Sequence, residues 1–171
     1  MNIVLIGYRG TGKSHVGRIV AQRLKMQCIS MDAKIVEKAG MPVPEIVQRC
    51  GWPGFRDMES EVARELAGQN GLVIDTGGGV IERPENIAAL AADGLVVWLK
   101  ASVAVIVSRI QGGTERPALT AGKSFTEEVA DVLVQRTPKY KAAAQFEIDT
   151  DLLGVKQVAD QVVALWRAHV R

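Results

Sequence analysis

Short apolar runs recur along the chain, separated by longer stretches in which apolar residues return every three or four positions. Four runs predict buried strands, because strands buried on both faces of a parallel sheet are continuously apolar rather than alternating. These runs are residues 2–6, 27–30, 72–75 and 95–99. A fifth, less apolar run at residues 145–149 predicts one further strand.

The stretches between these runs have the spacing of amphipathic helices. The last but one opens with Ser124 and Glu127, a pair that fits a capping box. Strands that alternate with helices predict an α/β fold, a parallel sheet with helices on both faces. The predicted helices are residues 13–25, 56–68, 84–92, 101–110, 124–143 and 154–169.

Two stretches do not fit regular elements. Residues 40–54 hold three prolines and three glycines around a short helical turn. Residues 111–123 are polar, flanked by glycine, and have no apolar period. A loop of this length in a compact domain is usually functional, so the second stretch is predicted to be a lid.

Composition narrows the class of protein. The 171 residues suit one domain, 1–171, and 21 basic against 19 acidic side chains give a net charge of +2. This balance argues against a nucleic-acid or membrane-surface partner, and no apolar run reaches the roughly 18 residues that span a bilayer. Residues 2–6 lack the basic flank of a signal peptide. Cys28 and Cys50 form no CxxC pair, which favours a reducing, cytoplasmic location.

The glycine-rich segment Gly7–Ser14, GYRGTGKS, carries the clearest chemistry. It matches G-x-x-x-x-G-K-[ST], follows a predicted strand and opens a predicted helix. Glycines let successive backbone N–H groups turn inward, and the helix start adds a positive end. Lys13 would reach the β- and γ-phosphates and Ser14 would bind Mg²⁺. The segment predicts a nucleoside triphosphate site rather than a structural turn.

The segment does not identify the phosphoryl acceptor. GTPases that share it also need an N-K-x-D element to recognise the base. None of the three asparagines, Asn2, Asn70 and Asn86, stands in such an element. A small kinase is therefore the predicted class.

Further motifs follow in order. They are SMD at 30–32, FRDME at 55–59, GGG at 77–79, RP at 116–117 and RTPKY at 136–140. Asp32 follows the second predicted strand, at the edge where α/β sheets bind their ligands. Together with the glycine-rich segment Gly7–Ser14, which is a P-loop, this set of motifs resembles the shikimate kinase family. The resemblance covers essentially the whole chain and holds in the order and the spacing of the motifs.

The resemblance implies a three-layer P-loop fold like that of nucleoside-monophosphate kinases, with a five-stranded parallel sheet. Residues 33–60 would form a substrate-binding region and residues 111–123 the lid. The implied reaction is ATP-dependent phosphorylation of the shikimate 3-hydroxyl, on the route to chorismate and the aromatic amino acids. ATP and shikimate are the implied partners, Mg²⁺ the cofactor and a cytoplasmic monomer the expected form.

Site residues follow by position from the same resemblance. The nucleotide would be bound by Gly10, Thr11, Gly12, Lys13, Ser14, His15, Arg109, Arg116 and Leu153. Shikimate would be bound by Asp32, Arg56, Glu59, Gly77, Gly78, Gly79 and Arg136. Catalysis would fall to Lys13, to Asp32 as proton acceptor, and to Arg116 as a lid residue that bridges the phosphates. Arg56 and Arg136 would clamp the carboxylate, as paired guanidinium groups do.

Simpler roles stay open for single residues. Asp32 could cap the helix that begins near Ala33, and Arg136 could be a mid-helix ion-pair partner. Arg56 could be a solvated surface residue, and Gly77–Gly79 a flexible turn. The joint placement of these residues favours the functional interpretation over each simpler one.

The chain also departs from the family pattern. Ser30 stands where the family has a metal-side aspartate, whereas Asp75 ends the third predicted strand. We hypothesise that the negative charge on the metal side has moved from position 30 to position 75, although Asp75 could be a hydrogen-bonded loop residue.

Trp52-Pro53 and Leu153 are further departures. The departures at Ser30 and Trp52 leave room for another acceptor, so a kinase for another small hydroxy acid such as gluconate stays an alternative. A second alternative, of a different class, is a nucleotide-binding regulatory protein with little turnover.

Overall fold

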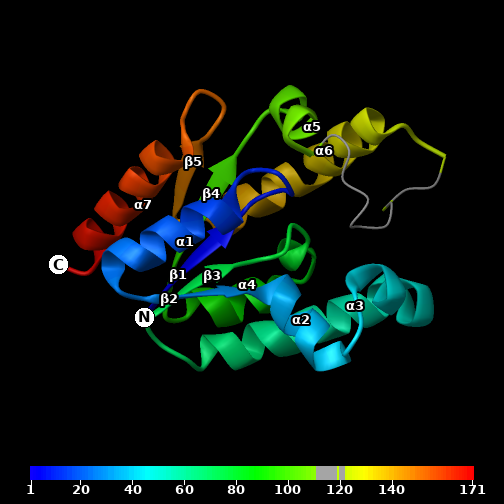
Figure 1. Ribbon diagram of the computed structural model, residues 1–171, viewed down its shortest axis with the longest axis horizontal. Coiled ribbons are helices and arrows are strands. Elements are labelled where there is room, and N and C mark those ends of the chain that lie inside the picture. The colour runs from blue at the N-terminus through cyan, green and yellow to red at the C-terminus, as the bar shows by residue number, and fades with distance from the viewer. Residues whose placement is uncertain (111–118, 120–121) are drawn as a thin grey trace.

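The computed structural model describes residues 1–110, 119 and 122–171, and these residues form an α/β fold built on a parallel sheet (Figure 1). The strands are β1 (Asn2–Ile6), β2 (Gln27–Ser30), β3 (Leu72–Asp75), β4 (Gly94–Lys100) and β5 (Phe146–Asp149). The described strands pair in the order β2-β3-β1-β4-β5, and every pairing is parallel. This arrangement confirms the five-stranded parallel sheet that the sequence predicts.

Helices cover both faces of the sheet. They are α1 (Lys13–Leu24), α2 (Met31–Ala39), α3 (Val43–Ala67), α4 (Pro84–Ala91), α5 (Val103–Ile110), α6 (Phe125–Ala143) and α7 (Val155–His169), with a 3₁₀ turn η1 (Val80–Glu82). Figure 1 shows α1 and α7 on one face and α3 and α4 on the other. Within the described ranges, no helix is long and apolar enough to cross a membrane.

The central strand β1 feeds two hydrophobic cores. Ile3 and Leu5 pack with α1 and α7, whereas Val4 and Ile6 pack with α3 and α4. Successive side chains of a strand point to opposite faces, so a continuously apolar strand fills both cores at once. This explains why β1 reads as an unbroken apolar run and is wholly buried.

The prediction of four buried strands is correct for β1, β3 and β4 and wrong for β2. Strand β2 lies at one edge of the sheet, and none of its residues is fully buried. An edge strand has a neighbour on one side only, so part of its surface stays in contact with solvent. Strand β5, at the other edge, is also mostly exposed.

The expectation that residues 40–54 are largely irregular is wrong. Helix α3 covers Val43–Ala67 and is interrupted at Gly51, whose φ of 68° lies outside the helical range. Pro44 lies in the first turn, where its missing N–H would have no helical partner. Pro53 follows the break and so begins a second helical segment. The prolines and glycine therefore divide a helix rather than prevent one.

Candidate active site

The glycine loop joins β1 to α1 with a backbone that side chains would obstruct. Gly10 and Gly12 have φ values of 82° and 93°, in the left-handed region that favours glycine. A Cβ on Gly7 would lie 2.4 Å from the carbonyl oxygen of Leu99. Gly12 precedes the first residue of α1 without a side-chain cap, so the helix start offers its N–H groups to an anion.

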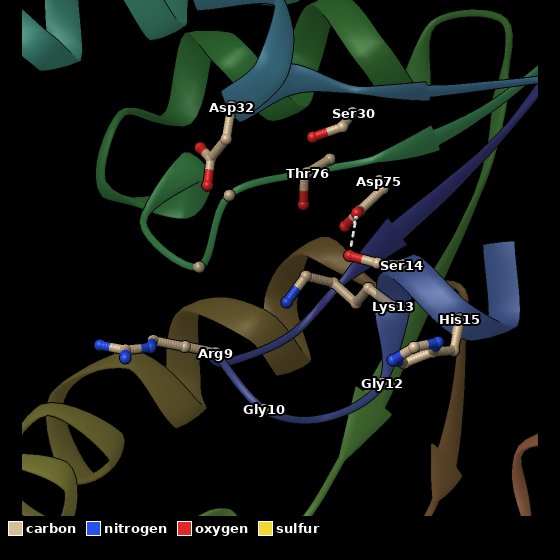
Figure 2. Close-up of a pocket in the computed structure, with 12 residues that line it drawn as sticks. Arg9, Gly10, Gly12, Lys13, Ser14, His15, Ser30, Asp32, Asp75 and Thr76 are labelled. Atoms are coloured by element: carbon tan, nitrogen blue, oxygen red, sulfur yellow. Dashed lines mark hydrogen bonds between the residues drawn. The ribbon is translucent and has the colours of Figure 1, made fainter. Parts of the chain in front are cut away.

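Lys13 and Ser14 project from the first turn of α1 (Figure 2). The Lys13 ammonium is buried and donates to the carbonyls of Gly7 at 2.7 Å and Tyr8 at 2.9 Å. Ser14 Oγ donates to Asp75 Oδ2 at 2.5 Å. The loop therefore places a cation and a hydroxyl–carboxylate pair side by side.

A cavity of roughly 320 Å³ opens over this loop. It is lined by Arg9, Gly10, Gly12, Lys13, Ser14, His15, Ser30, Asp32, Asp75, Thr76, Gly77 and Gly78. In Figure 2, Ser30 and Asp32 lie across this cavity from the glycine loop. The structure thus brings together most of the predicted phosphate-side residues with the predicted proton acceptor.

Ser30 caps helix α2, and Asp32 faces the cavity. The Ser30 side chain accepts from the Ala33 N–H at 3.2 Å and caps α2, so the alternative that Asp32 is the N-cap is wrong. Asp32 lies in the first turn and faces the cavity. A carboxylate there benefits from the positive end of the helix. Ser30 also pairs directly with Asp75 across β2 and β3.

Arg56 is held on the inner side of α3. Its Nη1 donates to Glu59 Oε1 at 2.8 Å, and the Glu59 side chain is fully buried. Burial raises the pKa of Glu59, although the adjacent Arg56 acts in the opposite direction. The Arg56 guanidinium also lies 5.3 Å from the centre of the Trp52 ring. These contacts fix the orientation of Arg56, so it is not a solvated surface residue.

The Gly77–Gly79 turn passes close to both predicted clamp arginines. A Cβ on Gly79 would lie 2.2 Å from Arg56 Nη2, and one on Gly78 would lie 3.5 Å from Arg136 Nη1. A side chain at position 79 would therefore displace the Arg56 guanidinium, so glycine at this position allows Arg56 its place against the turn.

Arg136 projects from α6 and is buried. Its Nε donates to Glu82 Oε1 at 2.9 Å, so Arg136 is an ion-pair partner, as the simpler interpretation suggests. It also lines a small pocket together with Tyr8, Arg9, Trp52, Arg56, Gly78, Leu119, Phe125 and Glu128. Arg136 therefore both forms an ion pair with Glu82 and lines the pocket. One helical turn further, the Tyr140 hydroxyl donates to the Gly78 carbonyl.

The far side of the glycine loop opens into another cavity, of roughly 400 Å³. Its lining includes Gly10, His15, Arg109, Thr150 and Leu153. Arg109 donates to the carbonyl oxygens of Gly10 at 3.2 Å and Thr150 at 3.1 Å. The predicted nucleotide residues thus extend continuously from the phosphate cavity to this one.

Some residues escaped the sequence analysis, and one predicted residue is not described. Arg116 and most of the predicted lid lie outside the described residues. Arg9 occupies a variable position of the glycine motif, yet it lines both the phosphate cavity and the arginine pocket. Glu82 lies three residues after the glycine triplet and has no motif of its own. Its contact with Arg136 joins positions 54 residues apart, so no local pattern could reveal it.

The fold and site together define a class. A parallel sheet whose first strand leads through GYRGTGKS into a helix is a P-loop nucleotide-binding fold, and an acidic side chain facing the loop is what a kinase of this type needs. Comparison with known proteins gives the family. A sequence model of the family "Shikimate kinase" matches residues 9–167.

Individual relatives agree with the family model. The shikimate kinase of Geobacter sulfurreducens is 42% identical over 98% of this chain and 92% of its own length. That of Thermodesulfovibrio yellowstonii is 39% identical over 95% of this chain and 92% of its own. The structure of shikimate kinase from Acinetobacter baumannii in complex with shikimate superposes with a TM-score of 0.93 at 32% identity, covering 98% of this chain and 93% of that one. The chain belongs to the shikimate kinase family and is an ATP-dependent small-molecule kinase.

Proposed function

We propose that this chain transfers the γ-phosphoryl group of ATP to the 3-hydroxyl of shikimate, giving shikimate 3-phosphate and ADP for chorismate and aromatic amino acid synthesis. One observation carries the proposal: Arg56 and Arg136 line one pocket, and Gly78 borders both this pocket and the phosphate cavity. An acceptor with a carboxylate on the arginines would place its hydroxyls towards the glycine loop. Two guanidinium groups suit a carboxylate because each offers paired donors.

Asp32 would accept the proton of the attacking hydroxyl. A hydroxyl is a weak nucleophile, and a carboxylate within reach gives its proton a place to go as the bond to phosphorus forms. Asp32 faces the same cavity as Lys13 and the start of α1. The acceptor hydroxyl would therefore lie between the proton acceptor and the phosphate-binding loop.

On the phosphate side, Lys13 would exchange its contacts with the Gly7 and Tyr8 carbonyls for phosphate oxygens. The N–H groups at the start of α1 would bind the same anionic group. Ser14 and Asp75 offer a hydroxyl and a carboxylate oxygen, the hard donors that suit Mg²⁺, so these residues fit the metal. Bound Mg²⁺ would neutralise charge on the phosphate oxygens.

The remaining assignments are part of the same proposal. Arg109 and Leu153 would flank the adenine in the cavity beyond the glycine loop. Arg116 would close over the phosphates from the lid. Residues 1–171 would work as one kinase domain and as a monomer. The two cysteines are free thiols, which suits a reducing cytoplasm.

The alternatives have less support. A kinase for gluconate would also need a carboxylate clamp, but the relatives that are 39–42% identical to this chain are shikimate kinases. A regulatory protein with little turnover would have no use for Asp32 facing the phosphate cavity.

The test is ADP release from MgATP with shikimate, gluconate and related hydroxy acids. We expect strong stimulation by shikimate alone, abolished in Asp32→Asn and Arg136→Ala. Asp160→Asn and Arg167→Ala are matched controls, because both residues lie exposed on α7 and should leave the rate unchanged. Stimulation by another acid, or by none, would overturn the proposal.

A further inference from the structure

Glu82 joins the glycine turn to the clamp helix α6. It ends η1, which begins directly after Gly79. Glu82 Oε1 accepts from Arg136 Nε at 2.9 Å, and Glu82 Oε2 accepts from Lys139 Nζ at 3.1 Å. Both carboxylate oxygens are therefore engaged by one helix, and the carboxylate has little freedom to turn away from Arg136.

The contact occupies one particular edge of the guanidinium. Arginine binds a carboxylate either along the edge that includes Nε or across its two terminal nitrogens. Glu82 takes Nε, so the donors of Nη1 and Nη2 are not engaged by this carboxylate. Nη1 lies beside the Gly78 backbone, at the wall that the arginine pocket shares with the phosphate cavity.

Arg56 provides an independent precedent in the same pocket. Its Nη1 is held by a glutamate, Glu59, and its guanidinium lies over an aromatic ring, that of Trp52. Arg136 is likewise held by Glu82, and its guanidinium lies 5.9 Å from the centre of the Tyr8 ring. Each arginine thus contacts one carboxylate and at least one aromatic ring, since the Arg56 guanidinium also lies 5.5 Å from the centre of the Phe55 ring. The difference is burial, since Glu59 is fully buried and Glu82 is about one-third exposed.

We propose that Glu82 is a positioning residue for the acceptor: it fixes Arg136 so that Nη1 and Nη2 present a two-point donor to the acceptor's carboxylate. The proposal rests on the proposed function, because it assigns that carboxylate to Arg136. Lys139 supports Glu82 from the solvent side and does not itself line the pocket. The Tyr140 hydroxyl donates to the Gly78 carbonyl, so α6 has a second attachment to the glycine turn besides the one through Glu82.

A purely electrostatic role predicts the opposite outcome. If Glu82 only offset the charge of Arg136, its removal would leave a freer cation and bind the acceptor anion more tightly. If Glu82 orients Arg136, its removal lets the guanidinium turn and weakens binding. A purely structural role predicts lower stability with the same loss for every acceptor. The direction in which shikimate affinity changes, and whether that change depends on the acceptor, distinguish the electrostatic, orienting and structural roles of Glu82.

The experiment compares Glu82→Gln and Glu82→Ala with the wild type by calorimetric shikimate binding and by steady-state kinetics. Glu82→Ala should raise both Kd and KM for shikimate about tenfold, as for one lost hydrogen bond to a charged group. Glu82→Gln keeps an acceptor oxygen and should raise them only about threefold. We expect kcat within about twofold and an unchanged KM for ATP, because the phosphate side is untouched.

Two controls complete the test. Glu85→Gln removes the same charge from an exposed position on α4 and should change nothing. The methyl ester of shikimate has no carboxylate charge, so Glu82→Ala should reduce its turnover no more than about twofold relative to wild type. Tighter shikimate binding in Glu82→Ala, unchanged binding, or an equal loss with acid and ester would each overturn the role of Glu82. A wild-type protein that does not phosphorylate shikimate would overturn the proposed function as well. This result distinguishes a failure of the proposed function from a failure of the role of Glu82 alone.

Discussion

The phosphate side of the site is built mainly on one continuous segment, Gly7–Ser14, with Asp75 beside it, whereas the acceptor side is assembled from α2, α3, the glycine turn and α6. The first side works mainly through backbone N–H groups and a helix start. The second works through side chains that other side chains must orient, as Glu59 orients Arg56 and Glu82 contacts Arg136. Binding of nucleotide and of acceptor should therefore respond to different substitutions.

Lys13→Ala should give the largest difference between the loss of turnover and the loss of shikimate binding. The variant loses the cation that stabilises the transferred phosphoryl group, so kcat should fall about 10²–10³-fold. Shikimate binding measured by calorimetry without nucleotide should stay within about twofold of wild type, because Lys13 does not line the arginine pocket. Lys141→Ala, an exposed position on α6, is the control. A parallel loss of shikimate affinity would show that the two sides are not separate.

Gly79→Ala should damage the acceptor side alone. A Cβ 2.2 Å from Arg56 Nη2 must displace the guanidinium, so KM for shikimate should rise at least about tenfold. Unfolding free energy should fall by about 1–3 kcal/mol, as for other overpacked sites. ATP binding should be retained.

Gly68→Ala provides the matched substitution. Gly68 has an αR backbone at the end of α3, and its nearest contact for an added Cβ is 3.6 Å away. It should leave both substrates' KM values unchanged, and comparable losses in the two variants would contradict the account.

Asp75→Asn should weaken the metal response of the phosphate side. The substitution removes the anionic oxygen beside Ser14, and Mg²⁺-dependent ADP binding, measured by calorimetry, should weaken about tenfold. Turnover should fall far more than in Ser30→Ala. That second variant should instead lose about 1 kcal/mol of stability, because Ser30 caps α2. Small and equal effects of both on Mg²⁺ dependence would refute a metal-side role for position 75.

The smallest expected effect concerns pH and Glu59. Burial raises its pKa, so the folded protein binds this proton more tightly than the unfolded chain does. The stability that Glu59 contributes is therefore greatest at a pH below its pKa in the unfolded chain. It falls as the pH rises towards the pKa of Glu59 in the folded protein. Melting temperatures across that range should fall more in wild type than in Glu59→Gln. Glu37→Gln, exposed on α2, should follow wild type, whereas identical slopes in all three proteins would contradict the shift.

Most of the fold could be predicted from the sequence because the spacing of apolar residues follows which side chains are buried. Strands β1, β3 and β4 are wholly or almost wholly buried, and their apolar runs placed them correctly. The capping box of Ser124 and Glu127 is confirmed at the start of α6. Residues 40–54 were misjudged because proline and glycine usually end helices, whereas here Pro44 and Pro53 stand near the starts of two helical segments.

The site was predictable to the extent that its groups belong to motifs. Lys13, Asp32 and Arg56 stand at motif positions, and the structure places all three at cavities or pockets. Ser30 as the cap of α2 and Glu82 as the partner of Arg136 depend on exact backbone geometry and on long-range contacts. The sequence offers both Ser30 and Asp32 as cap candidates for α2 without deciding between them, and it carries no signal for the contact of Glu82 with Arg136.

The identity of the phosphorylated product decides whether this chain phosphorylates shikimate at its 3-hydroxyl. Purified protein is incubated with MgATP and shikimate, and the product is examined by phosphorus and proton NMR. We expect one ADP for each shikimate 3-phosphate, with phosphorus coupled to the proton at C3, and loss of this product in Asp32→Asn. Release of inorganic phosphate with unmodified shikimate, or phosphorylation at another hydroxyl, would contradict this expectation.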